Sequence, residues 1–162
     1  MEEELEQRIE QNDFVDLANC TSKNQIGIYL DIFEKNIDPF SSRESIEKLG
    51  NEIVKETDYW WVIRNKFYKD YKNRFLVISK RFMLSIEELT PNETINAFTV
   101  FTDLKKEYKI QGGGLLFRFG ETRLSGSSVK RLHFHIVEPN ESCPTPLWLG
   151  CKIKPSKKRR KQ

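Results

Sequence analysis

The chain contains 162 residues, of which 38% are hydrophobic and 31% charged, and its 27 Lys or Arg against 24 Asp or Glu give a formal net charge of +3. This length and composition predict one globular domain with a buried core rather than a disordered or fibrous chain. No apolar run approaches the length of a membrane span, which argues against an integral membrane protein.

The cysteines and the first residues indicate a reducing compartment. Cys20, Cys143 and Cys151 form neither an even set nor a Cys-x-x-Cys pair, as is typical of free thiols inside cells. Three of the first four residues are glutamates, whereas a secretory signal starts with basic residues. We therefore expect a soluble cytoplasmic protein.

The charges are unevenly distributed along the chain. The first ten residues carry five glutamates, whereas residues 152–161 carry seven Lys or Arg and no acid. Such a basic run predicts a disordered tail over residues 151–162. A tail of this kind is either simply solvated, binds nucleic acid, or serves as a nuclear address in a eukaryotic cell.

Residues 1–55 are expected to form a helical extension. Helices are predicted over residues 2–12 and 42–57. The second follows a Ser-Ser-Arg-Glu capping pattern and has apolar residues at helical spacing, at Ile46, Leu49, Ile53 and Val54. Residues 25–33 fit either a helix or a strand, and we favour the strand.

Residues 56–150 have the pattern of an α+β domain. Runs of bulky and β-branched residues predict strands at 59–63, 74–79, 115–119 and 131–137. Residues 85–89 predict a short helical turn, and 91–108 a longer helix with a Thr-Pro-Asn-Glu start. This order predicts an antiparallel sheet with flanking helices.

The two histidines of the chain, His133 and His135, stand two residues apart in the last of these strands. Alternation along a strand places them on one face together with Arg131, and places the apolar residues Leu132, Phe134 and Ile136 on the other. We expect the apolar face to be core and His133 to line a cleft. Imidazole is well suited to nucleophilic and proton-transfer chemistry near neutral pH.

A small turn precedes the histidines and suits an anion. In Ser125-Gly126-Ser127-Ser128, successive backbone amides can form an anion-binding nest, and the serine hydroxyls add donors. A strand leaving this turn would present both imidazoles beside a bound phosphate. The combination predicts a phosphate-handling site in which one imidazole attacks phosphorus.

The run from 129 to 139, Val-Lys-Arg-Leu-His-Phe-His-Ile-Val-Glu-Pro, resembles the signature strand of the histidine triad superfamily of nucleotide hydrolases and transferases. That motif alternates three histidines with hydrophobic residues after a Gly-x-Ser/Thr-Val turn. Residues 63–68 are similar to the segment of this family on the nucleotide side, and residues 74–82 to its second strand. The resemblance covers about 80 residues in the order of the family, from 59 to 139.

The resemblance implies a role for each matched residue. His133 takes the central position and would be the nucleophile that forms a covalent nucleotidyl intermediate, while His135 at the third position would assist the leaving group. The resemblance also assigns phosphate contacts to Gly126, Ser127 and Ser128. It assigns nucleoside contacts to Asn65 and Phe67.

Arg131 is the main departure from the family pattern, because it stands where the first histidine is found. An arginine there would bind an additional phosphate through its planar guanidinium. We also expect its charge to lower the pKa of His133, since like charges disfavour the protonated imidazole.

The activity implied by the resemblance is hydrolysis or nucleotidyl transfer on dinucleoside polyphosphates, nucleoside phosphoramidates or related phosphoesters, without a metal or cofactor. The alternative is a catalytically degenerate module that binds nucleotides or RNA. The family also commonly forms homodimers. A zinc site made by the histidines with Cys143 and Cys151 is a further reading, although the Cys-x7-Cys spacing is unusual for zinc.

Overall fold

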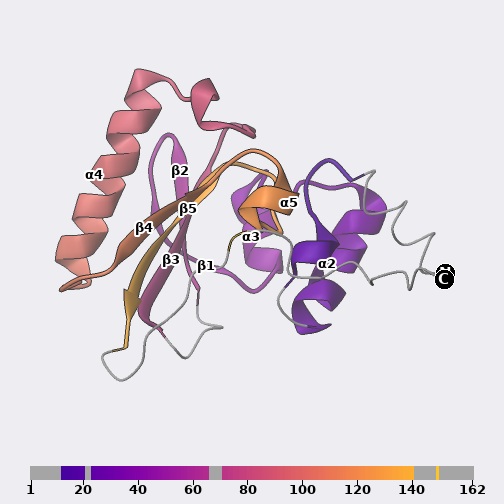
Figure 1. The fold of residues 1–162 in the computed structure, drawn as a ribbon, viewed down its shortest axis with the longest axis horizontal. Helices are drawn as coiled ribbons and strands as arrows, with labels where there is room; N and C mark the ends of the chain where they lie inside the picture. The colour runs from indigo at the N-terminus through magenta and orange to yellow at the C-terminus, as the bar shows by residue number, and fades with distance from the viewer. Residues whose placement is uncertain (1–11, 21–22, 66–70, 141–148, 150–162) are drawn as a thin grey trace, which may run out of the picture.

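The computed structural model describes residues 12–20, 23–65, 71–140 and 149. It shows a five-stranded antiparallel sheet with the strand order β1-β2-β3-β5-β4 and helices on both faces (Figure 1). The elements are, in chain order, η1 (Leu17–Asn19), α2 (Lys23–Lys35), α3 (Arg43–Lys48), β1 (Glu52–Glu56), β2 (Trp60–Arg64), β3 (Tyr71–Ser79), η2 (Ile86–Glu88), α4 (Pro91–Glu107), β4 (Gly114–Arg118), α5 (Thr122–Ser125) and β5 (His133–Pro139). The predicted α+β class with an antiparallel sheet is confirmed.

Strand β5 pairs on both sides, with β3 and with β4. Its apolar residues face α4, where Phe134 stacks on Phe117 at 4.6 Å between ring centroids and meets Trp60 edge-on at 5.5 Å. Phe134 and Ile136 are each 1% exposed, and Leu132 just before the strand is fully buried. The predicted burial of these three residues is therefore confirmed.

Helix α4 follows the prediction closely, because its start is defined by the sequence. The Thr90 hydroxyl accepts a hydrogen bond from the backbone N–H of Glu93, and the Glu93 side chain returns to the backbone of Thr90, with Pro91 at the first helical position. Gly113 lies after α4, directly before β4. A Cβ on this residue would lie 1.9 Å from the Val137 carbonyl oxygen. Only glycine fits where β4 begins beside β5.

Two predictions for the N-terminal part were wrong. Residues 25–33 belong to helix α2 rather than to a strand, since Tyr29, Ile32 and Phe33 recur at helical spacing and pack inward. The helix predicted over 42–57 stops at Lys48, and Gly50 with φ 73° turns the chain into β1. The apolar residues Ile53 and Val54 are compatible with the spacing of a helix and with that of a strand. Pairing with β2 stabilises the strand.

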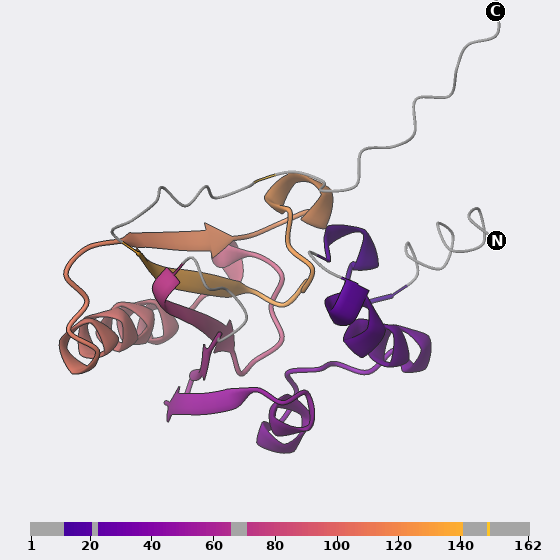
Figure 2. The ribbon, with the colours of Figure 1, turned by 90° about the horizontal axis from the view of Figure 1, so that it is seen from below.

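The N-terminal segment packs directly on the sheet. Phe40 and Ile46 form a buried cluster with Trp61, Ile63 and Ile78, on the face opposite α4. Figures 1 and 2 show α4 at one side of the sheet and α2 and α3 at the other. The sheet thus has one face devoted to the main core and one face covered by α2, α3 and the chain before β5.

Several predictions lie outside the described residues. These are the helix over 2–11, the basic tail, and the positions of Cys143 and Cys151. Asn12, which is described, is not helical. Within the described ranges, no helix combines the length and the apolar character that crossing a bilayer requires.

Candidate phosphate-binding histidine site

The two histidines lie on the sheet face that α4 does not cover. Across the sheet, His133 pairs with Ile78 of β3 and Arg118 of β4, and His135 pairs with Leu76 and Leu116. The two imidazole rings meet edge to face, with their centroids 5.2 Å apart. Because paired residues share a face, Arg118 is brought beside His133 by strand register alone.

The histidines line a pocket of about 90 Å³ together with most of the residues that the sequence singled out. Gly126, Ser127, Ser128 and Asn65 all border it. Phe67 lies outside the described residues. Further walls come from residues that were not predicted for the site: Gln25, Tyr29, Arg74, Leu76, Arg118 and Val129.

The turn before the histidines is built on one left-handed residue. Gly126 ends the short helix α5 with φ 67°, and its N–H donates to the Thr122 carbonyl at 2.8 Å. The Ser127 hydroxyl donates to the Val129 carbonyl at 2.6 Å and accepts from the Val129 N–H at 3.2 Å. A side chain at Gly126 would strain this backbone, so the loop depends on glycine.

Hydrogen bonds fix the tautomer of His133. Its Nδ1 lies 2.8 Å from the Arg131 carbonyl oxygen, which can only accept, so Nδ1 carries the proton in the neutral ring. Nε2 lies 3.4 Å from the Ser127 hydroxyl oxygen, whose proton is directed to Val129. The Nε2 lone pair is therefore available on the pocket side of the ring.

His133 is 4% exposed, and this burial lowers its pKa to about 4. The positive charge of Arg118 lowers the pKa further, while the hydrogen bond to the Arg131 carbonyl opposes the shift. The ring is consequently neutral at pH 7. The lowered pKa was predicted, but its cause was not: burial dominates, and the nearby charge is that of Arg118 instead of Arg131.

Arg131 does not line the pocket, so the prediction that it binds phosphate is wrong. It precedes β5, and its guanidinium donates to the carbonyl oxygens of Ser79 and Lys80 at 2.8 Å each and forms an ion pair with Asp38. Its Cζ also lies 5.1 Å from the centre of the Phe82 ring. The strand begins only at His133, so the alternation of side chains between the two faces does not extend to Arg131.

The N-terminal segment holds in place the loop formed by Gly126, Ser127 and Ser128, which we call the phosphate loop because of its predicted role. Val15 forms an isolated antiparallel bridge with Val129, in which the Asp16 N–H donates to the Ser128 carbonyl at 3.0 Å. The Asn19 side chain donates to the Ser127 carbonyl at 3.0 Å and to the Thr122 carbonyl at 2.9 Å. Nothing in the sequence signalled these contacts, because they join residues more than a hundred positions apart.

Two of the pocket residues could have been found from the sequence. Alternation along the predicted strand 115–119 restricts Arg118 to one of two faces, and pairing with β5 selects the histidine face. Arg74 lies two residues before Leu76 on β3 and so shares the same face. Gln25 and Tyr29 had no such signal, since residues 25–33 were predicted to be a strand.

The arrangement suits attack on an anionic phosphorus centre. A neutral imidazole points its Nε2 into a pocket that also holds two guanidinium groups, those of Arg74 and Arg118, and the Gly-Ser-Ser loop. Cations and amides of this kind stabilise charge that develops on phosphoryl oxygens. Among the described residues, no three His, Cys, Asp or Glu side chains gather as a metal site would require. The suggested zinc site would need the two cysteines outside those ranges.

Comparison with known proteins supports the fold. Neither a family model nor a curated protein matches the sequence. Among solved structures, a hypothetical histidine triad nucleotide-binding protein from Sulfolobus tokodaii strain 7 matches with a TM-score of 0.51 and 21% identity, over 71% of this chain and 80% of that one. A Hit-like protein involved in cell-cycle regulation from Bartonella henselae matches with a TM-score of 0.50 and 20% identity, over 66% and 80%. The chain has the fold of histidine triad proteins.

The ion pair between Arg131 and Asp38 predicts a stability effect. Arg131→Met and Asp38→Leu should each lower the free energy of unfolding by about 3–5 kcal/mol, because each leaves a buried charge without its partner. The double variant should lose less than the sum of the two, by roughly 1–3 kcal/mol. Urea unfolding of the four proteins measures this, and additive losses would contradict the pairing.

The pKa of His133 predicts a pH dependence of stability. The folded pKa of about 4 lies below the ordinary histidine pKa of 6.5, so the unfolded chain binds more protons between these values. Stability is therefore complete above about pH 6.5 and falls by about 3 kcal/mol as the pH drops to 4. Urea unfolding across this interval should show the loss in the wild type and not in His133→Asn. Parallel profiles of the two proteins would show that His133 titrates normally in the fold.

Proposed function

We propose that the protein is a histidine triad hydrolase or nucleotidyl transferase that acts on dinucleoside polyphosphates, nucleoside phosphoramidates or related phosphoesters. The observation that carries the proposal is the His133 ring, which is neutral, held with Nδ1 protonated, and turned so that Nε2 faces a cationic pocket. The fold shared with histidine triad proteins supports the same class.

In the first step, Nε2 of His133 attacks the α-phosphorus and forms a P–N bond while the bond to the leaving group breaks. The Arg131 carbonyl, 2.8 Å from Nδ1, stabilises the positive charge that develops on the ring. His135 lies edge-on to His133 and transfers the proton that the leaving group needs. Gly126, Ser127 and Ser128 bind phosphoryl oxygens.

In the second step, water or another acceptor attacks the same phosphorus and gives up its proton to His135, which lost one in the first step, and the P–N bond breaks to regenerate neutral His133. Attack by water gives a nucleoside monophosphate, and attack by another acceptor gives transfer. Arg74 and Arg118, which border the pocket, stabilise the negative charge in both transition states. Asn65 contacts the nucleoside, as does Phe67 in the interpretation of the sequence.

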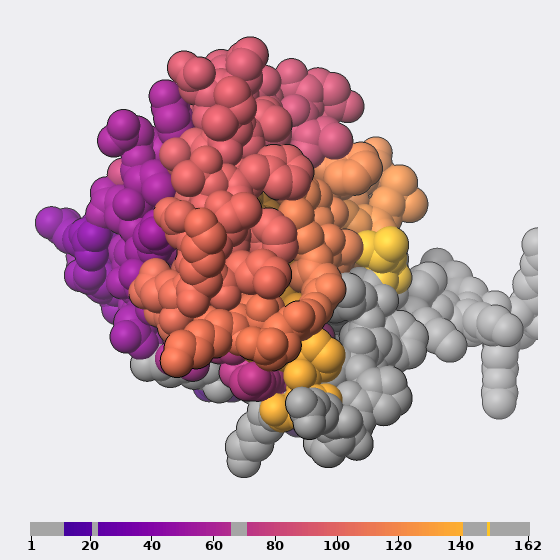
Figure 3. Space-filling model, turned by 90° about the vertical axis from the view of Figure 1, so that its left-hand side faces the viewer, coloured from indigo at the N-terminus to yellow at the C-terminus, as the bar shows by residue number. Residues whose placement is uncertain are grey.

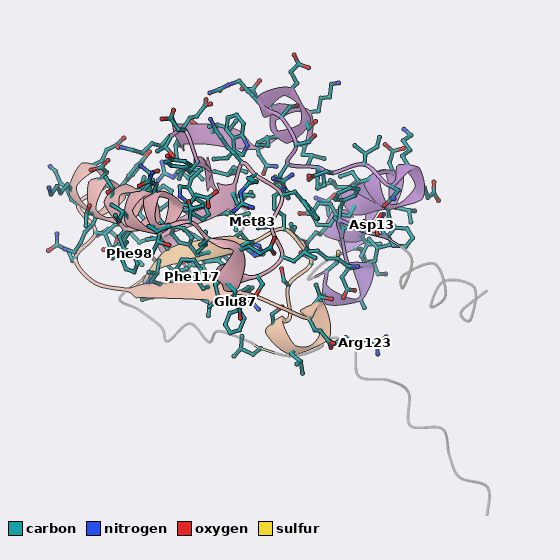
Figure 4. The ribbon with its side chains drawn as sticks, turned by 90° about the horizontal axis from the view of Figure 1, so that it is seen from above. Asp13, Met83, Glu87, Phe98, Phe117 and Arg123 are labelled. Atoms are coloured by element: carbon teal, nitrogen blue, oxygen red, sulfur yellow. The ribbon has the colours of Figure 1, made fainter. Side chains whose placement is uncertain are left out.

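His133→Ala should reduce kcat/KM for a dinucleoside polyphosphate or phosphoramidate by on the order of thousands-fold, as loss of a nucleophile does. His135→Ala should cost about a hundred- to ten-thousand-fold, the range of a proton-transfer partner. Arg123→Ala is the matched control, because Arg123 is exposed on the outer side of α5 (Figure 4), and it should keep the wild-type rate.

The same assay separates the enzyme from a degenerate module that binds nucleotides or RNA. Nucleotide binding without turnover in the wild type would establish the binding module. A fully active His133→Ala would exclude the covalent mechanism. Trapping of a nucleotidylated His133 in the wild type, followed by mass spectrometry, would identify the intermediate directly.

We further propose that the protein forms a homodimer through α4 and β4. Ile95 is 66% exposed and Phe98 53% exposed on α4, and within the described residues β4 pairs with β5 only. Figure 3 shows α4 and β4 together on one face, and Figure 4 shows Phe98 beside Phe117 of β4. An edge strand next to exposed apolar side chains is suited to pairing with a second copy.

Sedimentation velocity tests the dimer. The wild type should sediment as a dimer, and Phe98→Lys should shift it to a monomer by placing a charge in the apolar contact. Leu124→Lys is the control, since Leu124 is 73% exposed on α5 and away from this face. A wild type that stays monomeric at every concentration would contradict the interface.

A further inference from the structure

Helix α2 closes one side of the histidine pocket, although nothing in the resemblance to histidine triad proteins involves this part of the chain. Tyr29 is partly buried against the cluster that contains Phe40 and Trp61, and both Tyr29 and Gln25 line the pocket. The Gln25 amide nitrogen lies 3.1 Å from the Ser128 hydroxyl oxygen. The helix is thus held against the phosphate loop at its first turn and against the sheet one turn later.

The space within the pocket walls is small for the substrate class proposed above. Its volume is about 90 Å³, whereas pockets for whole small-molecule ligands occupy about 300–1,000 Å³. A space of this size accepts a phosphoryl group beside His133. A bulkier group that is to lie between the same walls must gain space from one of them.

The walls differ in how easily they can give way. Arg74, Leu76, Arg118 and the histidines stand on the paired strands β3, β4 and β5, and the loop is held by the bridge to Val15. Helix α2 has fewer buried residues, since only Ile32 and Phe33 near its end are buried. Its first half is held by the hydrogen bond from Gln25 to Ser128 and by Tyr29, which packs against the clusters around Phe40 and Val15. Movement of this half would break those contacts.

We propose that Tyr29 is a specificity-determining residue that limits the size of the group attached to the reacting phosphorus, with Gln25 holding it in position through Ser128. Compact phosphoryl groups enter the pocket directly. A nucleoside enters only when Tyr29 is displaced, which raises KM for nucleotide substrates. The effect on substrates rests on the proposed function, whereas the closure of the pocket over His133 does not.

Chemical modification tests the closure without a substrate. The chain has only two histidines, so diethyl pyrocarbonate, followed by ultraviolet absorbance in a His135→Asn background, reports on His133 alone. Tyr29→Ala should accelerate the reaction by roughly tenfold, the effect of a population shift worth about 1.4 kcal/mol. Gln25→Ala should accelerate it as well, and provides a second variant if Tyr29→Ala does not fold.

Two controls separate loss of the aromatic ring from general loosening of the helix. Tyr29→Phe keeps the ring and should react more slowly than Tyr29→Ala. Leu30→Ala changes the next residue of α2, which is 38% exposed, and should also leave the rate unchanged. Equal rates for wild type, Tyr29→Ala and Gln25→Ala would overturn the proposal.

Kinetics then connect the closure to specificity. Tyr29→Ala, in the presence of both histidines, should lower KM for a nucleoside phosphoramidate about tenfold with kcat little changed, while its Kd for inorganic phosphate should stay that of the wild type. An unchanged KM would overturn the specificity role. If modification accelerates but no protein turns over nucleotides, the proposed function fails and the closure by Tyr29 still holds.

Discussion

The double pairing of strand β5 is the constraint on which the other features depend. Hydrogen bonds to β3 and β4 on its two edges fix its register, and its alternation then separates the main core from the site. Phe134 contributes to the cluster under α4, while His133 and His135 face the opposite side. A shift of one residue would place both imidazoles in the core. Packing of Phe134 therefore positions His133 as well as stabilising the sheet.

Burial of His133 connects stability with chemistry. A desolvated imidazole costs free energy when it is protonated, which is why its pKa falls to about 4. The same burial keeps the ring neutral at pH 7, in the form that donates its Nδ1 proton to the Arg131 carbonyl. Arg118 adds to the effect on the resting ring, and its guanidinium also donates a hydrogen bond to the Ser125 carbonyl. The fold thus keeps His133 in its neutral form, and as a consequence the free energy of unfolding falls in acid.

Arg131 connects the histidine strand to the N-terminal segment of the chain. Arg131 is 4% exposed, and its ion pair with Asp38 connects the start of the histidine strand to the chain after α2. A histidine would be too short to satisfy Asp38 and two backbone carbonyls together. The bridge between Val15 and Val129 joins the same two regions. Arg131 and Val129 thus both join the start of the histidine strand to the N-terminal segment.

The sequence by itself determined the α+β class, helix α4, the central strands, and the opposite faces of His133 and Phe134, because capping and alternation are local properties. It also grouped the phosphate loop with the histidines, since the two are adjacent in the chain. Only the tertiary structure decided the partner of Arg131, the place of Arg118 beside His133 and the position of Tyr29 at the pocket. These depend on contacts between distant segments, and residues 25–33 could pack as helix or strand until the sheet face selected the helix. Local sequence patterns determine which residues share a face of a helix or strand. Long-range packing determines which other segments that face contacts.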